Sequence, residues 1–283
     1  MVKNEVRQFL ANIAPQQPIW VRYREPDHLQ REYRDEENRL VALAIYSTNS
    51  IHPTALGMTV VAEDAHLFSV ILADAQQEAR RQKKVRLVTW EFQPFSQFTD
   101  WLLTQGFAIW RQTVEPMAKL ASVTVTRNAT IQAVTLAEVI ANQSLKKQLL
   151  TWSLRQYQRV HAINPMAPTS VEKWSHLALP EALPNAPVAL IRQGKLVAYT
   201  FLFEDDPGVL TFAWMGAHRI DDLWALQEIQ IKWAQRQGMK QLTGEFDSTD
   251  DLAWQTARKW PFEPAPSYTM IGQQLPDNFE STK

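Results

Sequence analysis

Three side chains that can accept a proton stand directly after β-rich runs of the sequence. Glu63 and His66 follow the run 54–62, and His218 follows the run 209–216. A histidine can serve as a general base near neutral pH because its free pKa is about 6.5. The same three residues are also typical of exposed loops or helix caps, which is the interpretation that we favour, and the catalytic interpretation remains open.

The composition excludes several other kinds of chemistry. The chain of 283 residues has no Cys, which excludes disulfides, cysteine catalysis and thiolate metal sites. Its six histidines do not follow the His-Glu-x-x-His spacing of a zinc site, so we expect no metal. The chain has only 8 Gly, and neither G-x-G-x-x-G nor a P-loop motif occurs. Dinucleotide-binding and P-loop folds therefore have no local support.

Charge and hydropathy restrict the partners. The formal net charge of −1 gives no reason to expect a nucleic-acid partner. No apolar run approaches the 18 residues or so that a membrane-spanning helix needs. The first seven residues carry charges where a signal peptide requires an apolar stretch. We therefore expect a cytoplasmic protein without a membrane span, of unknown oligomeric state.

The chain also contains two copies of one pattern. Three pairs of segments recur in the same order at an offset of about 155 residues, as internal repeats do. They are 39–45 with 195–201, 87–92 with 241–246, and 105–107 with 260–262. The repeat predicts two related domains, 1–125 and 126–283.

Each copy has the same expected order of strands and helices. Apolar periodicity and turn residues place helices at 69–82, 96–105, 222–237 and 250–260. β-rich runs between turn signals predict strands at 40–47, 54–62, 85–92 and 108–120, then at 188–192, 195–203, 209–216, 240–246 and 267–275. This order predicts an α/β (α+β) fold with a mixed sheet flanked by helices in each domain.

The order resembles that of the GNAT superfamily of N-acetyltransferases, and two copies resemble a tandem GNAT protein. The most specific part is the helix–strand–helix run that ends in Gly106-Phe107; the second copy has Pro261-Phe262 there. The resemblance implies transfer of an acetyl group from acetyl-CoA to an amine of a small molecule or peptide. It also implies that a base, here Glu63, His66 or His218, deprotonates that amine.

The resemblance further implies a pyrophosphate loop at a helix start, patterned Arg/Gln-x-x-Gly-x-Gly/Ala. Neither copy keeps a glycine there. Ser69 and His66 favour the first copy, whereas Asp221 and Asp222 would cap the second helix and repel a phosphate. Acetyl-CoA is expected to contact Val60, Val61, His66, Leu67, Phe68, Ser69 and Val70 in the first copy, or Ala217, Trp224 and Ala225 in the second.

The resemblance also implies a tyrosine that acts as a general acid, and neither copy has one at the expected position. A tyrosine that protonates the leaving thiolate commonly stands four residues before the Gly of Gly-Phe, but Leu102 and Ala257 occupy those positions. A bulky Trp224 would also fill space that the coenzyme needs. The alternatives are therefore an inactive binding or scaffold protein, or a sensor that binds coenzyme A without turnover.

Overall fold

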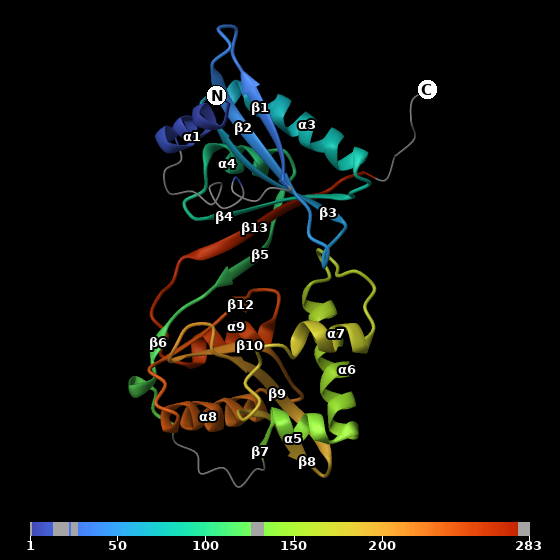
Figure 1. Ribbon diagram of the computed structural model, residues 1–283, viewed down its shortest axis with the longest axis vertical. Helices are drawn as coiled ribbons and strands as arrows, with labels where there is room; N and C mark the ends of the chain where they lie inside the picture. The colour runs from blue at the N-terminus through green and yellow to red at the C-terminus, as the bar shows by residue number, and fades with distance from the viewer. Residues whose placement is uncertain (1, 14–22, 24–27, 126–132, 277–283) are drawn as a thin grey trace. The chain divides into compact units, whose positions relative to one another are not determined.

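The computed structural model describes residues 2–13, 23, 28–125 and 133–276 (Figure 1). The chain forms two compact units. Unit 1 comprises Met1–Arg111, Ile163–Ala167 and Tyr268–Lys283, and unit 2 comprises Gln112–Ala162 and Pro168–Ser267. Each unit contains a mixed sheet with helices packed on it, which confirms the predicted α/β class.

Unit 1 contains a sheet in the order β1-β2-β3-β4-β13-β5. Strands β3 and β4 are parallel, and β1–β2, β2–β3 and β4–β13 are antiparallel. The elements are α1 (Val2–Ile13), β1 (Leu29–Arg34), β2 (Leu40–Ser47), β3 (Ala55–Ala62), a 3-10 turn η1 (Ala65–Leu67), α3 (Phe68–Arg81), β4 (Arg86–Phe92), α4 (Gln97–Thr104), β5 (Ala108–Val114, which continues into unit 2) and β13 (Ser267–Gln274).

Both faces of this sheet are covered, because β2 is buried along nearly its whole length. On one face, α3 contributes apolar residues at helical spacing to the main core, namely Phe68, Ile71, Leu72, Ala75 and Ala79. On the other face, Val6, Phe9 and Leu10 of α1 pack against β2 and β3. The sheet is therefore a buried central layer, and the ends of its strands are the places where chemistry can be exposed.

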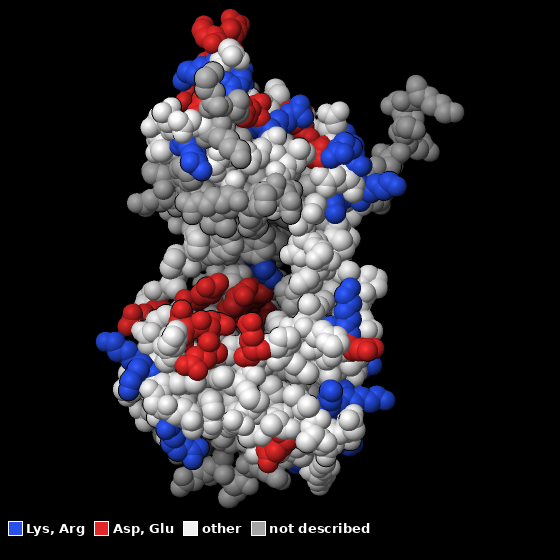
Figure 2. Space-filling view, viewed as in Figure 1, with Lys and Arg blue, Asp and Glu red and all other residues white. Residues whose placement is uncertain are grey.

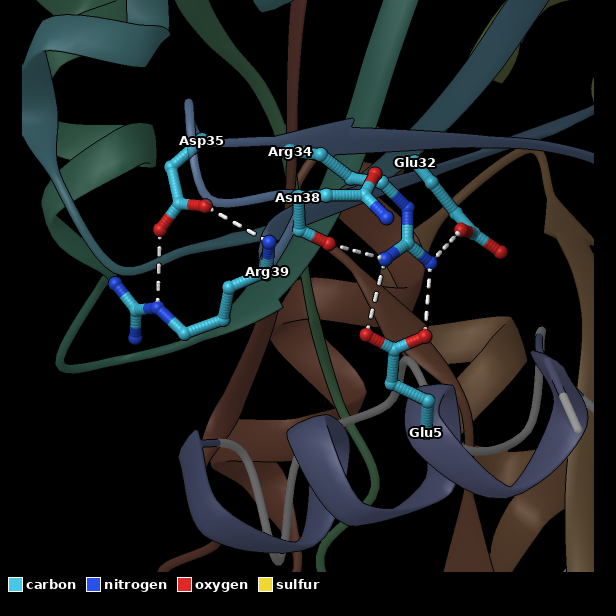
Figure 3. A network of polar contacts seen from close by, with 6 residues as sticks. All are labelled: Glu5, Glu32, Arg34, Asp35, Asn38 and Arg39. Carbon is cyan, nitrogen blue, oxygen red and sulfur yellow. Dashed lines mark hydrogen bonds and ion pairs between the residues drawn. The ribbon is translucent and has the colours of Figure 1, made fainter.

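An ion-pair network fixes α1 on the β1–β2 hairpin (Figure 3). Arg34 donates to both carboxylate oxygens of Glu5, at 2.9 Å each, and to Glu32 at 2.6 Å. It also donates to the carbonyl of Asn38, 2.8 Å away. Asn38 has φ 63°, a conformation that asparagine tolerates in turns. The two-pronged contact fixes the direction of the helix as well as its distance.

Unit 2 contains a sheet in the order β6-β11-β10-β9-β8-β7, with only β10 and β11 parallel. Helices α5, α6 and α7 belong to one face of the unit, and α8 and α9 pack with the other. The elements are β6 (Ala118–Lys119), η2 (Leu120–Ser122), β7 (Ala133–Thr135), α5 (Leu136–Ala141), α6 (Gln143–Val160), α7 (Val171–Ala178), β8 (Pro187–Arg192), β9 (Lys195–Phe203), β10 (Val209–Ala217), α8 (Ile220–Arg236), β11 (Gln241–Gly244), β12 (Phe246–Asp247) and α9 (Asp251–Lys259).

A strand from each copy pairs in the sheet of the other. β13, from the end of the second copy, pairs with β4 over seven residues in unit 1, where Figure 1 shows it in red beside β4 and β5. In return, β6 pairs with β11 in unit 2. The compact units thus differ from the continuous ranges 1–125 and 126–283 expected from the sequence, since a strand's apolar pattern does not specify its partner. Residues 126–132, just after that expected boundary, lie outside the described residues.

One expected strand is divided. The run 108–120 forms β5, an irregular stretch around Pro116, and β6. Proline has no N–H to donate to a ladder, so it interrupts the pairing. The break lets the chain leave one sheet and pair with β11 in the next.

Candidate functional site

In each unit, two neighbouring parallel strands diverge toward their carboxyl ends. β3 pairs with β4 only over Ala55–Gly57 and then runs on to Ala62. β10 pairs with β11 over Val209–Phe212 and then runs on to Ala217. The last residues of β3 and β10 thus extend beyond this parallel pairing. Each unit therefore presents a splayed strand end directly before a helix.

The splayed strand is bulged in unit 2. The register between β9 and β10 shifts between Ala213 and Met215, so Trp214 is an extra residue on β10. In unit 1, by contrast, β2 and β3 pair in unbroken register from Ala42↔Ala62 to Ser47↔Gly57. A bulge bends a strand and redirects the backbone groups that follow it, and bulges are frequent beside active sites.

Just before α3 in unit 1, the Asp64 carboxylate caps the 3-10 turn η1, whereas α3 itself, with Leu67 at its N-cap, has no side-chain cap. Asp64 accepts a hydrogen bond from the N–H of His66 at 3.0 Å, and its Oδ1 lies 2.8 Å from Nδ1 of the same histidine. The His66 side chain is 71% exposed. Behind it, Phe68 is buried against Phe98 and Trp101 of α4, with ring centroids 5.2 and 5.6 Å apart. An anion would have to displace Asp64 and would meet packed aromatic rings.

The other residues predicted for the first copy do not converge on one point. Val60 packs toward α3, whereas Val61 faces α1 on the opposite side of the sheet. Glu63 forms an ion pair with Arg39 at 2.9 Å. Three further predicted residues lie at the start of α3, where Leu67 is half-buried and Ser69 and Val70 are exposed.

At the start of α8 in unit 2, the arrangement is different. Arg219 is the N-cap, in extended conformation, and no side chain caps the helix within the described residues. The prediction that Asp221 or Asp222 caps this helix is therefore wrong. Asp222 is instead nearly buried and pairs with Arg192 of β8 at 2.9 Å. Because this carboxylate is paired with β8, it caps no N–H group of α8. The N–H groups of Asp222 and Leu223 donate to the Arg219 carbonyl, and the Asp221 carboxylate lies 3.6 Å from the Arg219 guanidinium.

Trp224 lies one turn into α8 and is half-buried. The ammonium of Lys259, from α9, lies 4.7 Å from the centre of its ring. The indole Nε1–H is buried and has no hydrogen-bond partner within the described part of the chain. The neighbouring predicted residues are internal: Ala225 is buried and Ala217 is half-buried. The cations Arg219 and Lys259 and the indole donor of Trp224 give this helix start groups that can bind an anion.

His218, the base predicted for the second copy, is exposed just after β10. Its ring stacks on Trp152 of α6, with centroids 4.5 Å apart. Its backbone N–H donates to Val197 on β9, so the residue extends the β9–β10 pairing. Among the described residues, no other titratable group contacts its ring, so the structure gives it no proton relay.

Sequence reasoning missed a second group of titratable residues on the α6 side of unit 2. His161 ends α6, and its Nε2 lies 4.0 Å from the Asp247 carboxylate. Asp250, at the start of α9, is only 7% exposed and accepts hydrogen bonds from Leu252 N and Gln156 Nε2. Burial raises the pKa of the Asp250 carboxyl above its usual range. The one signal in the sequence was a dense run of carboxylates after a strand, 245–251.

Figure 2 shows acidic side chains gathered on the face of unit 2 that lies over β12 and α9. The segment 245–251, which includes β12 and the start of α9, contains Glu245, Asp247, Asp250 and Asp251, of which Glu245 and Asp251 are exposed. Within the described residues there is no group of three or more His, Asp or Glu side chains arranged to hold a metal ion. In the same part of the chain, no helix is long and apolar enough to cross a membrane.

Comparison with solved structures places this fold. The chain is similar to a GCN5-related N-acetyltransferase from Sphaerobacter thermophilus, with 11% identity, TM-score 0.55, and coverage of 87% of this chain and 80% of the other. It is also similar to the glucosamine N-acetyltransferase region of a fungal multi-domain β-N-acetylglucosaminidase, with 11% identity and TM-score 0.56. That match covers 95% of this chain but only 36% of the fungal one.

No protein-family model and no curated protein matches the sequence. The likeness is therefore one of fold: a mixed sheet with a splayed strand pair, followed by a helix. The chain has the GNAT N-acetyltransferase fold, built twice.

Proposed function

We propose that the protein is an N-acyltransferase of the GNAT type, and that its second unit holds the donor acetyl-CoA. The observation that carries the proposal is the bulged, splayed end of β10 leading directly into the uncapped start of α8. A backbone bent in this way presents N–H groups to a ligand, and the helix start favours an anion. Unit 1 has the splayed pair without the bulge, and Asp64 caps the 3-10 turn that leads into α3.

The chain's own groups have distinct tasks in this proposal. N–H groups in the first turn of α8 bind the pyrophosphate, and Arg219 and Lys259 supply positive charge beside it. The Trp224 Nε1–H gains a hydrogen-bond acceptor that it otherwise lacks. Backbone N–H groups at the splayed end of β10 are placed to stabilise negative charge on a carbonyl oxygen. Acetyl-CoA would supply the thioester whose carbonyl carbon an acceptor amine attacks.

The acceptor is an amine of a small molecule or peptide, which must lose a proton to become nucleophilic. Groups that can take this proton occur in unit 2 close to β10, where Asp250 bonds to Gln156 of α6 and His218 stacks on Trp152. In unit 1, the candidates Glu63 and His66 are both engaged in ion pairs on the surface. The positions of the proton-accepting groups therefore favour unit 2 as the location of the reaction, as the proposed donor site does.

Calorimetric titration with coenzyme A tests the donor site. We expect wild-type protein to bind and Arg219→Glu to bind about tenfold to a hundredfold more weakly, since a charge-assisted hydrogen bond contributes about 1.5–3 kcal/mol. Arg236→Glu is the matched control, because Arg236 is a cation in the last turn of the same helix. If His66→Ala, and not Arg219→Glu, removed binding, the donor site would belong to unit 1.

Turnover is tested separately, by coenzyme A release from acetyl-CoA with a panel of amines. Release that depends on an added amine supports the transferase. Binding of coenzyme A without release would make the protein a sensor, and the absence of both at millimolar ligand would make it a scaffold. Each of the last two results would overturn the proposed activity.

A further inference from the structure

The end of α6 holds a histidine in one defined tautomer. Nδ1 of His161 lies 2.8 Å from the backbone carbonyl oxygen of Tyr157. A carbonyl oxygen can only accept, so Nδ1 carries the proton and the lone pair of the neutral ring is on Nε2. The ring is also stacked on the side chain of Tyr157, with centroids 4.0 Å apart. His161 is thus held with its basic nitrogen in a fixed direction.

That basic nitrogen faces Asp247. The distance from Nε2 to Oδ2 is 4.0 Å, and the two side chains are only 14% and 13% exposed. The hydroxyl of Thr113 donates to the other carboxylate oxygen at 2.5 Å, which fixes the carboxylate. When Nε2 takes up a proton, the carboxylate and the carboxyl end of α6 both stabilise the resulting imidazolium. The pair is therefore arranged to accept one proton at Nε2.

A buried hydroxyl in the same region lacks a partner. Tyr199 of β9 is fully buried, and its hydroxyl has no hydrogen-bond partner among the described residues. The ring lies over Gly216, where an added Cβ would stand 2.3 Å from one ring carbon and 2.9 Å from the hydroxyl oxygen. Gly216 follows the bulge of β10, so only glycine lets this hydroxyl reach the splayed strand end. Buried polar groups are usually hydrogen-bonded, so this hydroxyl is a candidate for bonding a ligand.

Contacts join these groups into one region. The N–H of Asp250 donates to the Asp247 carbonyl, and the Asp250 carboxylate accepts from Gln156 of α6. Asp250 and Arg159 both act electrostatically on Tyr199. Charged groups that face this end of α6 include Asp247, Asp250 and Arg159.

The surrounding charge is negative. Four carboxylates occur within the seven residues 245–251, and the sequence has no Lys or Arg between 241 and 257. Figure 2 shows carboxylates gathered over this part of unit 2. Such a field concentrates cations and repels anions.

We propose that His161 is the general base for the acceptor, that Asp247 stabilises its protonated form, and that the acceptor is a cationic amine bound between Asp250 and the Tyr199 hydroxyl. This inference rests on the proposed function. The ammonium of the acceptor first gives one proton to His161 Nε2. The neutral amine nitrogen then forms its bond to the acyl carbon, the carbon–sulfur bond breaks, and the second proton lost by nitrogen goes to the departing thiolate. A neutral or anionic acceptor does not fit the carboxylate-rich surroundings.

The first test observes His161 directly and needs no coenzyme. In an NMR pH titration of the histidine rings, Asp247→Asn is expected to move the His161 midpoint to lower pH by about half a unit or more, since a stabilising charge is lost. An unchanged midpoint would overturn the role of Asp247. Adding spermidine as a cationic probe is expected to shift the His161 ring signals, and the absence of any shift at millimolar spermidine would overturn the cation site.

The second test measures rates. His161→Gln is expected to lower kcat about a hundredfold, a typical loss on removing a general base, while Kd for coenzyme A stays within about twofold. His176→Gln is the matched control, an exposed histidine in the last turn of α7. Asp247→Asn is expected to move the acidic limb of the pH–rate profile to lower pH. Because misfolding would lower the rate without shifting this limb, the second variant keeps the test valid if His161→Gln folds poorly. Normal turnover in His161→Gln would refute the role of His161 as general base. Failure of the wild-type protein to bind coenzyme A would refute only the proposed function.

Discussion

The ion pair between Arg192 and Asp222 is the contact on which the proposed donor site of unit 2 depends. The Asp222 side chain is 8% exposed, and its Oδ1 accepts from Arg192 Nη2 at 2.9 Å. Its Oδ2 is buried and has no partner within the described residues. Arg192→Ala would therefore leave a nearly buried carboxylate with neither oxygen paired to a cation.

The size of the effect follows from burial. Removing one partner of a fully buried ion pair costs about 3–5 kcal/mol, and exposed pairs contribute about 0–1 kcal/mol. Arg192 is 50% exposed while Asp222 is not, so we expect Arg192→Ala to cost about 2 kcal/mol. At about 2–4 °C per kcal/mol for a chain of this size, the unfolding transition of unit 2 should fall by about 4–8 °C.

A double-mutant cycle measured by urea unfolding tests this reasoning. Asp222→Asn removes the charge that needs Arg192, so Arg192→Ala should cost at least 1 kcal/mol less in that background. The same carboxylate, once unpaired, repels phosphate, so Arg192→Ala should also weaken coenzyme A binding, while Asp222→Asn should not. An equal loss of stability in both backgrounds would refute the assignment of the pair.

Other residues give independent checks. Gly216→Ala would drive a Cβ into the ring of Tyr199 and should cost about 1–3 kcal/mol, measured by thermal unfolding; unchanged stability would mean that the ring lies elsewhere. Burial raises the pKa of Asp250, so the folded state binds this proton more readily than the unfolded chain does. Wild type should therefore gain stability relative to Asp250→Asn as the pH falls from neutral toward the ordinary Asp pKa of about 3.9, and a relative loss of stability in urea unfolding would contradict the burial. Thr135→Ala removes the capping box that Thr135 forms with Glu138 and should cost about 1 kcal/mol, with faster amide exchange in α5.

Local patterns in the sequence were enough to predict most elements. The apolar spacing of 69–82 predicted α3, which spans Phe68–Arg81. The pair Gln193-Gly194 predicted a hairpin, and both residues have positive φ, 53° and 75°, as a tight hairpin turn requires. The duplication was visible because both copies keep the same order of turns, strands and helices.

Contacts between distant segments could not be predicted in this way. The alternation in 267–275 predicts a strand, but it does not reveal that the strand pairs with β4, about 180 residues earlier. Asp222 looked like a helix cap because acidic residues at helix starts usually are, and only the fold brings Arg192 beside it. His161 had no local signal, since Asp247 lies 86 residues away.

The scarcity of glycine is weaker evidence against the donor site of unit 2 than the sequence suggests. Glycine at a phosphate loop serves to let the backbone approach the ligand, and its absence matters only where a side chain fills that space. In unit 1, that space holds the carboxylate of Asp64. In unit 2, Asp222 pairs with Arg192 and Ala225 is buried in the core, so neither covers the N–H groups at the start of α8. The direction of one carboxylate near each helix start therefore supports the proposal that the second unit holds the donor.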